Sequence, residues 1–265
     1  MYNSLQLTRK YLQYYFSASN AKGHGIHSPF VFDLIKNVLR DKKKYDCYEV
    51  IETGRQKLLK QSATIEVEDL GAGSGVIKKS KRSVAAIAAS SLKPKKYAQL
   101  LFRIVNHYRP QTILELGTSF GITSSYLAAG NTNGKVYTIE GSAAIAGIAE
   151  KTFKHTGFKN IEIGEGNFND TLPALLEKLN TIDLAFIDGN HRKEPTLDYF
   201  TQLLHCSTPS TILIFDDIHW SHEMEEAWTE IKQHPRVTLT IDLFFIGLVF
   251  FNPYLKSKQD FRIRF

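Results

Sequence analysis

The sequence predicts an α/β fold with a seven-stranded, mostly parallel sheet that ends in an antiparallel hairpin, preceded by an N-terminal helical extension. From about residue 110 onward, short β-rich runs alternate with stretches of helical periodicity. This alternation is typical of parallel strands joined by right-handed crossover helices. The last two β-rich runs are too close together for a helix between them, so we expect them to pair antiparallel. Before residue 110 the patterns are mostly helical.

The N-terminal third is expected to contain helices separated by turns. Ser28 and Pro29 suit a helix cap followed by a first-turn proline. Leu100, Leu101, Ile104 and Val105 form a one-sided apolar stripe that indicates a packed helix. The expected helices are 1–19, a segment beginning at Pro29, 46–61, Ser83–Ser90 and Tyr97–Tyr108, and the expected loops are Gly23–Phe30 and Leu70–Gly75.

The expected strands all follow residue 110. Helical patterns fill most gaps between the first five of them, which predicts parallel pairing. The seven strands are Thr112–Leu116, Lys135–Glu140, Asn160–Ile163, Ile182–Asp188, Thr211–Phe215, Val237–Leu243 and Phe245–Phe251. We therefore expect an accessory helical region at 1–94 and the main domain at 95–265.

Composition narrows the functional classes. Hydrophobic residues make up 43% of the 265 residues, which suits a globular protein with a sizeable core. The longest apolar run, Leu243–Phe251, is too short for a membrane-spanning helix. The two cysteines offer no disulfide framework, and the first residues lack a signal-peptide pattern, so we expect a cytoplasmic protein. The net charge of +6 keeps an RNA partner open, although a solvated surface explains it more simply.

Two glycine-rich segments compete for a ligand-binding role. Asp69–Gly75 follows a run with two glutamates and precedes a strongly basic one, so a plain loop is expected there. Glu115–Gly121 follows an apolar strand and precedes a helical run. Gly117 and Gly121 allow a tight turn and let a ligand approach the main chain. The second segment is therefore the expected cofactor loop.

Glu140 ends the strand after that loop, as expected of an acid that binds the ribose hydroxyls of a nucleoside cofactor. The glycine spacing is G-x-x-x-G, whereas NAD sites carry G-x-G-x-x-G beside a pyrophosphate. Glu115 would be unfavourable beside a pyrophosphate but is compatible with the amino-acid end of S-adenosylmethionine. These residues favour S-adenosylmethionine over NAD.

Three further segments carry a family resemblance. They are Gly166–Pro173, Ile182–His191 and Thr211–Trp220, which are similar to the G-x-x-x-D-x-x-P, D-x-x-F-x-D-x-x-K and fifth-strand D-N-x-x-W motifs. With the glycine loop, they resemble the class I, Rossmann-like methyltransferases, and among these the cation-dependent catechol and caffeoyl-CoA type O-methyltransferases. The resemblance covers about residues 95–250 and implies S-adenosylmethionine as cofactor. The cofactor-binding residues it implies are Glu115, Gly117, Thr118, Ser119, Gly121, Glu140, Gly141, Ser142, Gly166, Asn167, Phe168 and Asp188.

The resemblance also implies a divalent cation, such as Mg²⁺ or Mn²⁺, held by Asp188, Asp216 and Asp217. In the family such a cation lowers the pKa of a substrate hydroxyl and fixes the oxygen in place. The family lysine base corresponds here to His191, whose imidazole can take a hydroxyl proton near neutral pH. His191 and Asp188 are thus the expected catalytic residues. Asp217 replaces the family asparagine, and this extra charge leaves open both a tighter metal site and a site without metal.

The favoured function is O-methylation of a small molecule, with a homodimer possible. An RNA or protein acceptor and a cofactor-binding module without turnover are the alternatives. A remote alternative is an α/β-hydrolase, because Gly117–Gly121 also reads G-x-S-x-G and Ser119 precedes Asp188, Asp216 and His219.

Overall fold

The computed structural model describes residues 1–19, 28–69, 78–255 and 257–265. Leu70–Gly75, the expected loop, lies outside these residues. The chain forms two compact units, Met1–Arg40 with Leu179–Phe265, and Asp41–Lys178. We call them the terminal unit and the central unit. The expected boundary between residues 94 and 95 lies inside the central unit, and the functional division at that point stays a prediction.

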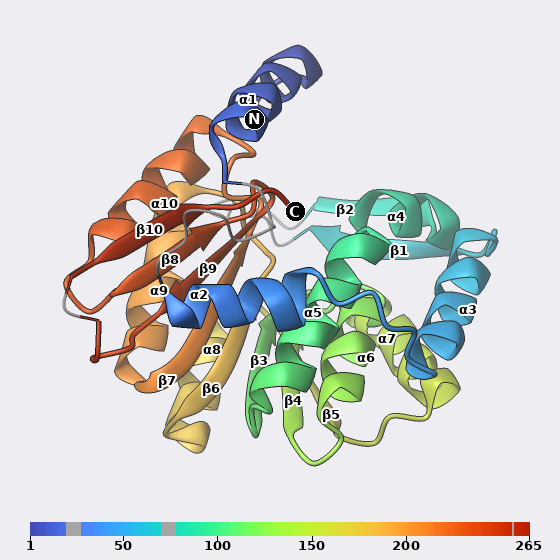
Figure 1. The fold of residues 1–265 in the computed structure, drawn as a ribbon. Coiled ribbons are helices and arrows are strands. Elements are labelled where there is room, and N and C mark those ends of the chain that lie inside the picture. The colour runs from blue at the N-terminus through green and yellow to red at the C-terminus, as the bar shows by residue number, and fades with distance from the viewer. Residues whose placement is uncertain (20–27, 70–77, 256) are drawn as a thin grey trace. The chain divides into compact units, whose positions relative to one another are not determined.

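Helices and strands occupy the following segments (Figure 1). The helices are α1 (Ser4–Ser17), α2 (Pro29–Leu34), the π-helical turn η1 (Ile35–Leu39), α3 (Cys47–Leu59), α4 (Val84–Ser91), α5 (Lys95–Tyr108), α6 (Ile122–Gly130), α7 (Ala143–Thr156), α8 (Phe168–Leu179), α9 (Lys193–His205) and α10 (His222–Gln233). The strands are β1 (Thr64–Asp69), β2 (Lys78–Ser83), β3 (Thr112–Leu116), β4 (Lys135–Glu140), β5 (Ile161–Glu165), β6 (Ile182–Ile187), β7 (Ser207–Asp216), β8 (Leu239–Asp242), β9 (Ile246–Phe250) and β10 (Gln259–Arg262).

The central unit contains three parallel strands in the order β3–β4–β5. The buried stripe expected on α5 is confirmed, because Leu100, Leu101, Ile104 and Val105 are all fully buried. Helices α3 and α4 share one hydrophobic core with α5 and α6, in which Ile51, Ile87, Phe102 and Ile122 pack together. Helices α3 and α4, which precede residue 95, thus contribute to the same core as α5 and α6, which follow it.

The β1–β2 hairpin corrects the expectation of a purely helical N-terminal region. The two strands pair antiparallel, with Glu66 opposite Lys81. Ile65 and Val67 alternate with acidic residues and pack against the hydrophobic core of the central unit. The run with two glutamates, which was not among the expected strands, therefore forms one strand of a two-stranded sheet, and its alternation gives that sheet one apolar face.

The terminal unit contains five strands in the order β10–β8–β9–β7–β6. β6 and β7 are parallel, whereas β9 runs antiparallel to both β7 and β8, which confirms the expected terminal hairpin. The short strand β10 adds parallel to β8 and was not expected. Its polar sequence, Gln259–Arg262, carries little strand signal, so its pairing depends on the neighbouring edge.

Helix α1 belongs to the terminal unit because both its side chains and the residues after it contact the C-terminal strands. Asn3 and Gln6 form a capping box at its start. Tyr14 packs against Phe244, and Ser19 bridges to Ile263 beside β10. Within the described residues, none of the helices combines the length and apolar composition needed to cross a membrane.

Candidate functional site

The glycine loop between β3 and α6 has the backbone that the sequence indicates. Gly117, Ser119 and Gly121 have φ angles of 101°, 49° and 77°, all in the left-handed range. A Cβ on Gly121 would lie 2.4 Å from a ring carbon of Phe153, so both the backbone and the available space require glycine there. The amides of Gly117 and Thr118 donate to the carbonyl of Ile139 and attach the loop to β4.

Glu115 belongs to a buried hydrogen-bond network that connects β3 with this loop. Its side chain is fully buried and accepts hydrogen bonds from the hydroxyls of Ser124 and Thr138, the latter at 2.6 Å. The Thr138 hydroxyl also lies 2.6 Å from that of Thr118. The structure therefore places Glu115 in a buried network beneath the loop, where it can act on a ligand through the loop residues.

Glu140 lies at the end of β4, on the strand next to β3. Its two carboxylate oxygens accept backbone hydrogen bonds, one from the Ser119 amide at 2.9 Å and one from the Ser142 amide at 3.1 Å. Burial raises the pKa of Glu140 above its usual value, and these hydrogen bonds offset part of that rise. Glu140 thus connects the glycine loop with the turn after β4.

Two further turns complete this edge of the central unit. The amide of Gly166, which has a φ of 134°, donates to the carbonyl of Glu140, so the turn before α8 lies against the end of β4. Gly141 and Ser142 follow Glu140, and Asn167 and Phe168 follow Gly166. Among the described residues, the buried Ser142 hydroxyl has no hydrogen-bond partner. We name these three turns, 117–121, 140–142 and 166–168, the cradle.

The cradle brings together the expected cofactor-binding residues of the central unit except Glu115, which lies in the buried network beneath the glycine loop. Its turns follow the carboxyl ends of three adjacent parallel strands, which is where open α/β sheets bind ligands. Asp188, also expected to contact the cofactor, belongs to the terminal unit.

A second group of polar residues lies in the terminal unit, where β6 and β7 end. Ligand atoms of Asp188, His191 and Asp216 all lie within 4.8 Å of one another. The Asp216 side chain is buried, whereas the side chains of Asp188 and His191 are 17% and 30% exposed. His191 Nε2 lies 3.6 Å from Asp188 Oδ1. We call these three residues the acid–histidine cluster.

The acid–histidine cluster differs in one member from the expected metal ligands. It includes Asp188 and Asp216, as expected, but its third member is His191 and not Asp217. Asp217 has a left-handed φ of 53°, and its amide donates to Phe245. Two carboxylates and an imidazole at this spacing fit a divalent transition-metal ion such as Mn²⁺.

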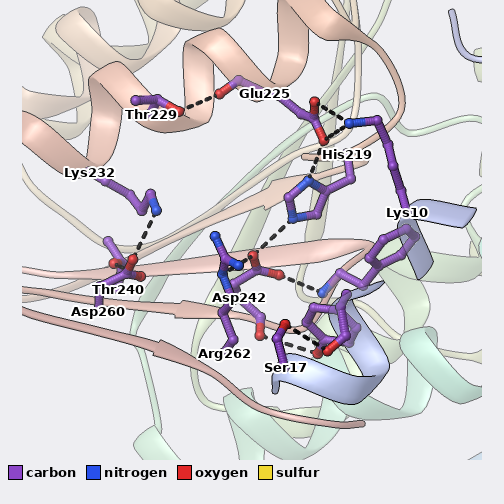
Figure 2. Close-up of polar contacts among 12 residues, drawn as sticks. Lys10, Ser17, His219, Glu225, Thr229, Lys232, Thr240, Asp242, Asp260 and Arg262 are labelled. Carbon is purple, nitrogen blue, oxygen red and sulfur yellow. Dashed lines mark hydrogen bonds and ion pairs between the residues drawn. The ribbon is translucent and has the colours of Figure 1, made fainter. Parts of the chain in front are cut away.

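His219 points into a different cluster (Figure 2). Its Nδ1 lies 2.9 Å from Glu225 Oε1 and its Nε2 lies 2.9 Å from Asp242 Oδ2. Glu225 also accepts hydrogen bonds from Lys10 at 2.8 Å and from the Tyr2 hydroxyl at 2.7 Å. We call these five residues the α1 anchor, because they connect α1 with α10 and β8.

The pKa shifts within the α1 anchor follow from these contacts. Burial alone would lower the pKa of His219, but the hydrogen bonds to Asp242 and Glu225 outweigh it and raise that pKa. Burial would likewise raise the pKa of Glu225, yet the hydrogen bonds from His219, Lys10 and Tyr2 lower it to about 2. His219 therefore has carboxylate partners other than Asp188 and Asp216, and nothing in its contacts supports the hydrolase alternative.

Sequence reasoning missed two contacts near these groups. The Ser91 hydroxyl, at the end of α4, lies 3.0 Å from the hydroxyl of Ser119 in the cradle. The Asn190 amide donates a hydrogen bond to the Tyr199 hydroxyl. An asparagine in Asp-Gly-Asn-His is a recognisable left-handed turn signal. No local pattern indicates Ser91 or Tyr199, because only the folded chain brings them to their partners.

Comparison with known proteins indicates a protein family for the segment that contains the cradle and the acid–histidine cluster. Residues 114–218 match a family model described as a methyltransferase domain. This stretch is similar to methyltransferase domains. It includes the cradle residues and all three members of the acid–histidine cluster.

Two curated relatives of the chain are O-methyltransferases. A catechol O-methyltransferase from Niastella koreensis is 32% identical over 139 residues, which cover 51% of this chain and 61% of the relative. The O-methyltransferase imqG from Aspergillus flavus is 31% identical over 111 residues, which cover 40% of this chain and 44% of the relative. The chain thus spans less than two thirds of the length of either relative.

A solved structure shares the fold of this chain. An O-methyltransferase from Bacillus cereus in complex with SAH superposes with a TM-score of 0.56 at 22% identity, covering 83% of this chain and 97% of that one. The predicted α/β, Rossmann-like class is confirmed, and so is the resemblance to O-methyltransferases that the motifs indicated.

Proposed function

We propose that this chain is an S-adenosylmethionine-dependent methyltransferase that transfers a methyl group to an oxygen of a small molecule. The observation that supports this most strongly is the cradle, in which Glu140 lies between the glycine loop and the buried Ser142 hydroxyl, inside a stretch similar to methyltransferase domains. Bound there, S-adenosylmethionine would supply a methyl group attached to a sulfonium sulfur. This sulfur leaves readily because it becomes a neutral thioether. A cytoplasmic location and a homodimer stay predictions.

Glu140 would hold the ribose of the cofactor. Its oxygens accept hydrogen bonds from the Ser119 and Ser142 amides, and a hydrogen bond from the Gly141 amide also favours its charged form, whereas an ionised carboxylate has about four acceptor positions in total. Acceptor capacity therefore remains for the ribose hydroxyls. Their charge-assisted hydrogen bonds would favour the ionised carboxylate and oppose the effect of burial on its pKa. Ser142 would offer its hydroxyl to the same ligand.

His191 would act as the base toward the acceptor. Its imidazole can take a proton from a substrate hydroxyl, and Asp188 lies 3.6 Å from Nε2, close enough to stabilise the imidazolium that results. Its 30% exposure leaves the ring accessible. Methyl transfer needs no further covalent step from the protein, so holding the acceptor oxygen and removing its proton are the tasks we assign to this cluster.

We extend the proposal to a divalent cation at the same cluster. Asp188 and Asp216 would be its carboxylate ligands, with Asp217 as the third ligand that the family resemblance implies. His191 would then stay free to act as the base. The cation would supply a positive charge that lowers the pKa of the acceptor hydroxyl. Chelation with EDTA tests this part alone: loss of activity, restored by Mn²⁺ or Mg²⁺, supports the cation, and full activity in EDTA contradicts it.

The proposed function as a whole is tested by ligand binding and turnover. Calorimetry with S-adenosylhomocysteine should show binding, whereas NAD should show none. Labelled S-adenosylmethionine with catechol as probe acceptor should then give an O-methylated product. Binding without product from catechol or a panel of phenols would favour the non-catalytic alternative, and tight NAD binding would contradict the cofactor assignment.

A further inference from the structure

The turn between β6 and α9 carries His191 and has an unusual backbone. Asn190, directly before His191, has a φ of 55°, in the left-handed region. Residues other than glycine rarely adopt this backbone conformation, although asparagine tolerates it better than most. Non-glycine residues held in such regions concentrate at functional sites, where the surrounding structure fixes them.

The side chain of Asn190 is fixed by a single buried tyrosine. The Asn190 amide donates a hydrogen bond to the Tyr199 hydroxyl. Tyr199 belongs to α9, is fully buried, and has Thr196, Phe200 and Leu203 as buried neighbours on the same helix. A fully buried ring cannot change rotamer easily, so the position of the Tyr199 hydroxyl is fixed by packing.

Hydrogen bonds also fix the start of α9, so the turn before it has little conformational freedom. The Thr196 amide donates to the carbonyl of Arg192, the helix cap, and the Lys193 amide donates to Glu223. With β6 on one side and α9 on the other, the conformation of Asn190 decides where the next side chain points. That side chain is His191, whose ring turns back toward Asp188.

We propose that Tyr199 is a positioning residue for His191, acting through the side chain of Asn190. The hydroxyl holds Asn190 in its left-handed conformation, and this places the imidazole beside Asp188 and Asp216. The role assigned to His191 rests on the proposed function, but the positioning itself does not, since it is a property of the turn.

The first test measures the turn directly. Tyr199→Phe removes one oxygen and keeps the ring, and hydrogen exchange followed by mass spectrometry reports on the amides of residues 189–192. We expect their exchange to accelerate about 10-fold or more in the variant. Tyr126→Phe is the matched control, because Tyr126 is equally buried and its hydroxyl donates to Glu52, in the central unit. Unchanged exchange at 189–192 in Tyr199→Phe, or equal acceleration in Tyr126→Phe, would overturn the proposal.

The second test follows turnover with catechol. Tyr199→Phe should lower kcat on the order of 10–100-fold with little change in KM, because a displaced base affects the reaction more than binding. In a His191→Ala background the same change should have no further effect. Asn190→Gly, which adopts positive φ freely, should retain more activity than Asn190→Ala. Additive losses would show a general structural effect and contradict the positioning role.

The two proposals fail separately. If the protein transfers no methyl group, the exchange measurement still decides whether Tyr199 fixes the turn. If exchange at 189–192 is unaffected while catechol is methylated, the positioning proposal fails and the proposed function stands.

Discussion

His191 and His219 both lie beside acidic residues in the terminal unit, yet their surroundings differ. His219 has a carboxylate 2.9 Å from each ring nitrogen, and its side chain is 18% exposed. His191 has its contact with Asp188 at 3.6 Å and is 30% exposed. A ring with both nitrogens bonded to carboxylates holds its protons and is stabilised as a cation, so it makes a poor base. We therefore assign a structural role to His219 and propose a catalytic role for His191.

Two glutamates show the same contrast. Burial raises the pKa of Glu140, whose partners are backbone amides. The pKa of Glu225 falls to about 2, because His219, Lys10 and Tyr2 outweigh the effect of its burial. Glu225 thus has charged and hydroxyl partners from three segments of the chain, whereas Glu140 keeps acceptor capacity for a ligand. Four variants test this division between side chains whose hydrogen-bond partners lie within the protein and side chains that we propose are available to a ligand or substrate.

The largest effect is expected for His191→Ala. Removing a general base should lower kcat/KM for catechol by roughly 10²–10⁴-fold. The melting temperature should change little, because the ring is partly exposed. Methyl-transfer rates and thermal melts on the same preparation check both statements. Activity within a few-fold of the parent would show that another group takes the proton.

His219→Ala should give the opposite result. The change leaves the buried Asp242 without its imidazolium partner, whereas the half-buried Glu225 keeps Lys10, so the free energy of unfolding should fall by about 3–5 kcal/mol, mainly through Asp242. Urea denaturation measures this loss, and kcat per folded molecule should stay within a few-fold of the parent. A stable His219→Ala protein that has lost catalysis would reverse our assignment of the two histidines.

Glu140→Ala should weaken binding of S-adenosylhomocysteine by about 1–3 kcal/mol, since it removes charge-assisted hydrogen bonds to the ligand. Glu165→Ala is the matched control, because Glu165 is exposed and occupies the register position opposite Glu140 on β5. Calorimetry on both variants separates a specific contact from a general loss of negative charge. Equal affinities for the two variants would remove Glu140 from the cofactor site.

The smallest effect concerns the pH dependence of stability in Glu225→Gln. The pKa of Glu225 is about 2 in the folded protein, against 4.5 ordinarily. Its contribution to stability is thus present above pH 4.5 and disappears as the pH falls toward 2. The glutamine variant should therefore be less stable than the parent at pH 7 and close to it near pH 2–3. Urea midpoints at both pH values check this, and an equal difference at both would contradict the ionic role.

Much of the fold and the cradle could be predicted from local patterns. β3 and β4 begin and end at the residues expected, because their apolar runs are bounded by turn residues. The cradle could be located because glycines and a strand-end acid recur at a characteristic spacing. The β1–β2 hairpin was not predicted, because acidic residues interrupt the apolar pattern of Thr64–Asp69 and Lys78–Ser83 is strongly basic.

The acid–histidine cluster was located in part. Asp188, His191 and Asp216 come together because β6 and β7 are parallel neighbours and end at the same edge. Sequence order alone could not distinguish His191 from Asp217 as the third member. Only the folded chain shows that His191, and not Asp217, offers a ligand atom near those of Asp188 and Asp216.

By itself the sequence determined the α/β class and the strand order along the chain, because these follow from periodicity and short-range spacing, and it predicted the cofactor loop and the residues that we propose carry the chemistry. Only the tertiary structure decided that His219 belongs to the α1 anchor and that Tyr199 contacts Asn190. The physical reason is that a titratable side chain takes its role from its partners. For His219 these come from α10 and β8, segments that only folding brings together.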